Sequence, residues 1–156
     1  MKRLLGCCLS LLLVLALSAT ALAGSATKLE CVDMAKKAAE AILQDREGAL
    51  AEIAKRDGKF VWKDSYVFVM DFRGKMLAHP IMPGLSRMDT LFSVPDKNLE
   101  KPRMIFVDFV VTAATKGEGW VDYLWPKPGE TSPSPKDTFV FRVPGTELLT
   151  AAGYYK

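Results

Sequence analysis

The feature of this sequence that most constrains its fold is the stretch YVFVMD at residues 66–71. It is a nearly continuous apolar run, rich in aromatic and β-branched side chains, which is typical of a strand covered on both faces. The turn-like segment 72–75 contains a glycine, and the second apolar run, 76–79, stops at Pro80, which has no N–H to donate to a ladder. These residues predict an antiparallel hairpin inside a layered domain, with one more strand at 59–63.

Two segments have the apolar period of amphipathic helices. The first, 27–46, carries small and apolar residues on one arc, which suits close packing on a sheet. Gly48 is expected to interrupt this helix, and an apolar stripe then continues to Lys55. The second segment, 103–116, is apolar around much of its circumference and stops at Gly117, so we expect it to be largely buried. The arc of the first helix consists of Cys31, Val32, Ala35, Ala38, Ala39, Ile42 and Leu43.

Three further strands are expected at 120–125, 138–143 and 148–155, the last with an interruption at Gly153. The Pro/Ser-containing segment 127–135 is predicted to be a long hairpin connection. Short turns between strands imply antiparallel neighbours. The predicted fold class is therefore α+β, with one antiparallel sheet of five or six strands and a helix on at least one face.

Residues 1–23 have the pattern of a secretory signal peptide: a basic start, an apolar run and a small-residue cleavage signature at Ala21-Leu22-Ala23. The run is too short for a confident membrane span. We therefore expect an exported single domain, 24–156, that is not inserted in the membrane once the signal is cleaved; an uncleaved anchor is the alternative. Of the three cysteines only Cys31 would remain, so the apolar core must hold the fold without an intramolecular disulfide.

Charge and motifs favour no catalytic function. Loss of Lys2 and Arg3 would reduce the 21 basic residues to 19 against 18 acidic ones, and their scattered positions do not indicate a nucleic-acid partner. His79 is the single histidine, which excludes multi-histidine zinc and two-histidine iron sites. Neither a G-x-S-x-G elbow nor a phosphate-binding loop is present. We expect no enzyme activity, no metal and no cofactor.

Aromatic and cationic residues gather in the predicted sheet region, and an apolar pocket with a few placed polar groups suits a small ligand. A tyrosine hydroxyl, a lysine ammonium and a histidine N–H could converge on a carboxylate. The alternative is that the aromatic residues form a filled core and that His79 caps a strand end. The irregular segment 80–101 is unusually long for a compact domain, which is more often a sign of function. The gathered residues are Tyr66, Phe68, Trp120, Tyr123, Trp125, Lys127, Lys136, Phe139, Phe141 and Arg142.

Three segments resemble, in sequence and order, the single Cache domains, which are extracellular PAS-like sensor modules of bacteria. They are GKFVWKDSYVFVMDFRGKMLAHP (58–80), KGEGWVDYLWPKPG (116–129) and FRVPGTELLTAAGYY (141–155). The resemblance covers nearly the whole mature chain. It implies a PAS-like antiparallel sheet with a long N-terminal helix packed on it. It also implies a pocket between the sheet and the loop–helix segment after His79-Pro80, which in relatives often binds short organic acids such as acetate, propionate or pyruvate.

The resemblance implies ligand-binding roles for seven residues. Tyr123 and His79 would donate hydrogen bonds to a ligand carboxylate, and Lys127 would supply the counter-charge. Three of the others would form an apolar wall, and Pro80 lies beside the histidine. The apolar wall would consist of Phe68, Met70 and Trp125.

The chain departs from the family pattern at Phe139, where many relatives have a tyrosine, and across the pocket-covering segment 86–103. Family members are often anchored in chemoreceptors or kinases by transmembrane helices, whereas this chain ends at Lys156 without one. We therefore expect a stand-alone periplasmic or secreted domain that binds a small organic ligand reversibly, with ordering of 80–101 as the signal to a receptor or kinase. The alternative is a structural or protein-interaction module with a filled core, and a cavity beside His79 would discriminate between them.

Overall fold

The computed structural model describes residues 24–156, so the predicted signal peptide at 1–23 lies outside the described residues. Six strands form one sheet in the order β1-β2-β6-β5-β4, with β3 paired to β2, and every pairing is antiparallel. The elements are α1 (Lys28–Gln44), α2 (Arg46–Ile53), β1 (Val61–Trp62), β2 (Ser65–Asp71), β3 (Met76–Ala78), η1 (Pro83–Arg87), α3 (Ile105–Lys116), β4 (Glu118–Pro126), β5 (Pro133–Arg142) and β6 (Leu148–Tyr155).

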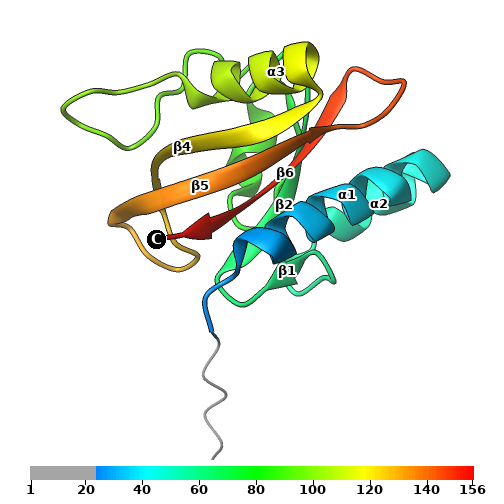
Figure 1. Cartoon of the computed structure of the whole chain (residues 1–156), viewed down its shortest axis with the longest axis horizontal. Coiled ribbons are helices and arrows are strands. Elements are labelled where there is room, and N and C mark those ends of the chain that lie inside the picture. The colour runs from blue at the N-terminus through cyan, green and yellow to red at the C-terminus, as the bar shows by residue number, and fades with distance from the viewer. Residues whose placement is uncertain (1–23) are drawn as a thin grey trace, which may run out of the picture.

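The sheet has a helical layer on each side (Figure 1). Helices α1 and α2 cover one face, and α3 with the segment before it covers the other. The last strand of the chain, β6, lies inside the sheet between β2 and β5. The predicted α+β class, with a PAS-like antiparallel sheet and an N-terminal helix packed on it, is confirmed.

Strand β2 contributes to both cores, as the sequence predicts. Because successive strand side chains point to opposite faces, Val67 and Val69 pack in the core under α1. Tyr66, Phe68 and Met70 point the other way and pack in the core under α3. Alternation within a single strand thus decides which side chains reach the α3 face, where the candidate site lies.

The predicted N-terminal helix is broken at Asp45, three residues before the predicted interruption at Gly48. Asp45 is extended and ends α1, and its carboxylate caps α2 by accepting a hydrogen bond from the Gly48 N–H at 3.0 Å. A short acidic side chain competes with the helical backbone in this way, so it favours caps over helix interiors. Gly48 is therefore part of the second helix and not the break.

Other boundaries also differ from the predictions. The strand predicted at 59–63 is reduced to the two residues of β1, Val61–Trp62. Strand β5 begins at Pro133, inside the predicted connection 127–135. Proline is tolerated there because β6 pairs with β5 only from Lys136 onward, so one side of this strand end needs no donor. Gly153 does not interrupt β6, which runs to Tyr155. The segment 80–101 also contains the short helix η1.

Candidate functional site

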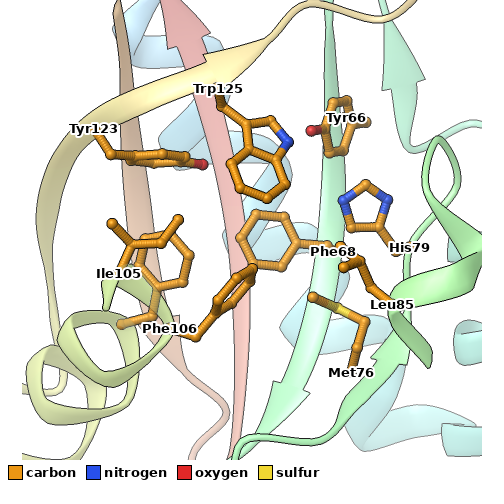
Figure 2. Close-up of a pocket in the computed structure, with 10 residues that line it drawn as sticks. Tyr66, Phe68, Met76, His79, Leu85, Ile105, Phe106, Tyr123 and Trp125 are labelled. Atoms are coloured by element: carbon orange, nitrogen blue, oxygen red, sulfur yellow. The ribbon is translucent and has the colours of Figure 1, made fainter. Parts of the chain in front are cut away.

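The α3 side of the sheet contains a small enclosed cavity, in the place where the resemblance implies a pocket (Figure 2). Its floor comes from β2 and β4, and its cover comes from α3 and from the segment after β3. The space open to the centre of a water-sized sphere is about 10 Å³, which is room for about one water molecule. The lining residues are Tyr66, Phe68, Met76, His79, Leu85, Ile105, Phe106, Phe109, Tyr123 and Trp125.

Aromatic rings close this cavity. The His79 ring centre lies 4.9 Å from that of Tyr66 and 5.7 Å from that of Phe68, with the Phe68 ring nearly parallel. Phe68 also packs against Phe109 at 5.6 Å. Such pairs are worth about 0.5–1.5 kcal/mol each beyond the area they bury. The walls are therefore stiff, and a guest larger than water requires part of the cover to move.

His79 has one ring nitrogen committed to the backbone. Its Nδ1 accepts hydrogen bonds from the N–H groups of Ile81 and Met82, at 3.2 and 3.0 Å. The proton of the neutral ring must therefore be on Nε2. Burial, and secondly the charge of Lys136, lowers the pKa of His79 to about 3. The single histidine thus shapes the start of the loop and carries a donor N–H among the cavity residues.

The tyrosines of this face are buried, and burial raises the pKa of Tyr66 and Tyr123. The Tyr123 hydroxyl shares a 2.9 Å hydrogen bond with Thr138 Oγ1. In Figure 2 the Tyr66 hydroxyl points toward the indole nitrogen of Trp125. Both phenols therefore stay protonated near neutral pH and can donate as well as accept.

Lys136 on β5 is a buried cation without a polar partner. The residue is 1% exposed, and Nζ makes no hydrogen bond or ion pair with any residue of 24–156. The nitrogen lies 4.1 Å from the ring centre of Tyr66 and 4.8 Å from that of Tyr155. Burial lowers the pKa of Lys136 to about 7. Lys136 does not line the cavity itself, but it lies directly behind a ring that does.

The structure brings together four of the seven residues assigned from the resemblance: Phe68, His79, Tyr123 and Trp125 all line the cavity. The other three do not line it. Met70 is buried on the same face, and Pro80 is buried directly after His79. Lys127 is half-buried, with Nζ 5.6 Å from the outer Tyr155 ring centre.

The residue that the resemblance did not single out is Lys136. Strand alternation could have found it, because Lys136, Thr138 and Val140 occupy the same face of β5 and are all buried. A lysine at an inward strand position is rarely buried unless it is paired, so the pattern itself is informative. The cover residues Leu85 and Ile105 carry no comparable sequence signal.

The cover is fastened at both ends of η1. Beyond η1, the Lys75 ammonium donates to the Met88 carbonyl at 2.7 Å, and the Leu91 N–H donates to the Gly74 carbonyl at 2.9 Å. Before η1, His79 holds the loop as described. Between these points η1 has no buried residue, and Leu85 alone reaches into the cavity. The part of the cover best able to move is therefore η1.

Farther along, Asp96 ties the cover to the sheet. Its buried carboxylate accepts hydrogen bonds from the N–H groups of Arg103 and Leu124, at 3.0 and 3.3 Å. The Lys97 N–H donates to the Leu124 carbonyl at 3.0 Å. Displacement of η1 therefore leaves the second half of the loop attached to β4.

Among residues 24–156, no three metal-binding side chains come together in a way that could hold an ion. Within the same range, no helix has both the length and the apolar content needed to cross a bilayer.

Residues 34–156 match the sequence model described as Cache domain, and the chain belongs to the Cache domain family. The resemblance read from the sequence is confirmed. The domain is of the sensor type that chemotaxis receptors carry, a class of ligand-binding and signalling modules consistent with small-molecule sensing.

Two individual relatives are also chemotaxis proteins. The chain is 32% identical over 77 residues to the methyl-accepting chemotaxis protein McpP of Pseudomonas putida; the match covers 49% of this chain and 13% of that receptor. A solved periplasmic sensor domain of a chemotaxis protein is 30% identical, with a TM-score of 0.63 over 80% of this chain and 86% of the other.

Two more distant structures share the fold. One is a Cache chemosensory domain solved to show the structural basis for carboxylic acid recognition. It is 23% identical with a TM-score of 0.67, and the match covers 81% of this chain and 91% of the other chain. The other, a methyl-accepting chemotaxis protein from Vibrio parahaemolyticus, has 19% identity and a TM-score of 0.66, covering 82% and 87%.

Proposed function

We propose that this Cache domain is a periplasmic sensor that reversibly binds a short carboxylic acid in the cavity beneath η1 and passes its occupancy to a membrane receptor or kinase. The observation that carries the proposal is the buried ammonium of Lys136, which has no counter-ion among the described residues. A buried charge is normally paired. A carboxylate in the cavity would lie across the Tyr66 ring from this nitrogen and would supply a counter-charge at short range, without contacting it directly.

The other groups suit the same ligand. His79 would donate from Nε2, and the hydroxyls of Tyr66 and Tyr123 can also donate. Phe68 and Trp125 offer apolar surface for a short alkyl chain. The proposal therefore keeps four of the residues assigned from the resemblance and gives the counter-charge to Lys136 in place of Lys127. The ligand class is also supported by the structural neighbour that is described for its carboxylic acid recognition.

Entry of the acid would require η1 to move. Even acetate has four heavy atoms, whereas the closed cavity holds about one water molecule. Displacement of Leu85 would open the cavity, while His79, Met88 and Asp96 keep the flanking segments in place. The proposed signal is thus a change at η1 between closed and occupied forms.

The small cavity favours a second candidate, an interaction module whose core is filled. A ligand titration distinguishes the sensor from the interaction module. We expect acetate, propionate or pyruvate to raise the thermal unfolding temperature, because an acid at 100 times its Kd stabilises the folded state by about 2.7 kcal/mol. Propionamide, which has the shape of propionate without its charge, should have a much smaller effect.

Two variants provide matched controls. Lys136→Met should abolish the response to acids, because it removes the counter-charge. Lys127→Met removes a lysine that does not line the cavity and should leave the response unchanged. If no short acid stabilises the unmodified protein, the sensor proposal fails and the filled-core module is preferred.

A further inference from the structure

We propose that Lys136 couples ligand binding to proton uptake, so that the affinity of the domain for a carboxylate falls as the pH rises above neutrality. This inference rests on the proposed function and adds a regulation of the same site. A chemoreceptor domain of this kind would report acid concentration and pH together.

The geometry isolates the amine. Its Nζ lies against the ring faces of Tyr66 on β2 and Tyr155 on β6, and its cross-strand neighbour on β4 is Tyr123. Gly153 leaves the room that the lysine stem occupies, since a Cβ at that position would lie 2.7 Å from Lys136 Cε. Aromatic faces attract a cation, but this attraction is weaker than the charge-assisted hydrogen bond that a carboxylate would accept.

No nearby group neutralises the ammonium. His79, after β3, is neutral at any pH well above 3. Cys31 on α1 is a buried thiol, and burial raises its pKa to about 11. Cys31 and, secondly, Asp64 in the turn between β1 and β2 raise the pKa of Lys136, but the Asp64 carboxylate already accepts a 2.7 Å hydrogen bond from the Ala26 N–H.

The effect of burial outweighs these neighbours, and the pKa of Lys136 in the free protein is about 7. A carboxylate in the cavity favours the charged amine and raises that pKa. Below pH 7 the free protein already carries the proton, so the affinity is constant there. Above pH 7 binding must take up a proton, and the affinity falls about tenfold per pH unit. Between pH 7 and pH 9 the Kd should rise about 50-fold.

Calorimetric titration of the whole domain with propionate tests the coupling. Titrations in two buffers of different ionisation enthalpy report the protons taken up per ligand bound. We expect about one proton at pH 8.5 and about a tenth of one at pH 6. Propionate stays ionised over this range, so the protons cannot come from the ligand. Lys127→Met is the control and should show the same uptake.

A second measurement needs no ligand. The ε-methylene carbon of Lys136, assigned by NMR with Lys136→Met as the reference spectrum, should titrate near pH 7 in the free protein. Titration near the 10.5 of an exposed lysine would overturn the coupling. Propionate binding at pH 8.5 without proton uptake would overturn it too and leave the proposed function standing. If propionate, acetate and pyruvate all fail to bind at pH 6, both proposals are refuted.

Discussion

Replacement of Lys136 by methionine should stabilise the folded domain, and the gain should shrink as the pH rises from 7 to 9. The pKa of Lys136 is lowered from the 10.5 of an exposed lysine to about 7. Each pKa unit corresponds to about 1.36 kcal/mol, so holding this ammonium in the folded protein costs about 5 kcal/mol. Methionine is one heavy atom shorter, and the space it leaves costs about 1 kcal/mol. At pH 6 the Lys136→Met protein should therefore be more stable by about 4 kcal/mol.

The sign of the pH dependence follows from linkage. Between the folded and unfolded pKa values, the unfolded chain holds a proton on Lys136 that the folded chain lacks. The free energy of unfolding therefore rises with pH in this window, by about 2 kcal/mol from pH 7 to pH 9. The methionine variant lacks this contribution, so the difference between the two proteins shrinks over the same interval.

Urea unfolding at pH 6, 7, 8 and 9 measures both quantities. Other groups titrate in both proteins, so their contributions cancel in the difference. Lys127→Met is the control, because it removes a lysine that is only half-buried. Parallel curves for the unmodified and methionine proteins would refute the reasoning. So would a variant that is less stable than the unmodified protein at pH 6.

Three further substitutions test the support of the site. Gly153→Ala should lower the free energy of unfolding in urea by about 1–3 kcal/mol, because the new Cβ meets the Lys136 stem and strand backbone. The control, Gly84→Ala, places its Cβ in open space and should lower it by less than about 0.5 kcal/mol. Equal costs would contradict the packing argument. Asp96→Ala should lower the free energy of unfolding by about 2–3 kcal/mol and speed amide exchange at Leu124, since buried N–H groups lose their acceptor. Unchanged exchange would show that Asp96 does not hold the cover to β4. Leu85→Ala should increase affinity for acids longer than propionate relative to acetate in calorimetry, and an unchanged ratio would show that η1 does not limit the cavity.

The closed cavity and the unpaired lysine are physically linked. The Tyr66 ring lines the cavity on one side and covers Lys136 on the other, and burial behind it and Tyr155 excludes bulk solvent from the ammonium, which lowers its pKa. The same exclusion strengthens any charge-assisted hydrogen bond that a ligand forms there. Ligand selectivity and pH dependence would therefore have a common cause in the burial of Lys136.

Local pattern was enough to predict most of the fold. The apolar run at 66–71 predicted a strand covered on both faces, and Val67 and Phe68 do pack in opposite cores. Errors arose where a single polar side chain decided the outcome, as when Asp45 divided α1 from α2 ahead of Gly48. They also arose at Gly153, where a residue that usually weakens strands is required by a neighbour on another strand.

The sequence by itself determined the elements and their antiparallel order, because alternation and turn chemistry act between near neighbours. The family and the four assigned residues that line the cavity came from the resemblance of three segments to Cache domains. Only the tertiary structure decided that Lys136, and not Lys127, lies behind the cavity, and that Leu85 closes it. Both depend on strand register and on a loop that returns across the sheet. The environment that shifts the pKa of a lysine is assembled from β2, β4, β5 and β6, which are distant in sequence, so no local pattern contains it.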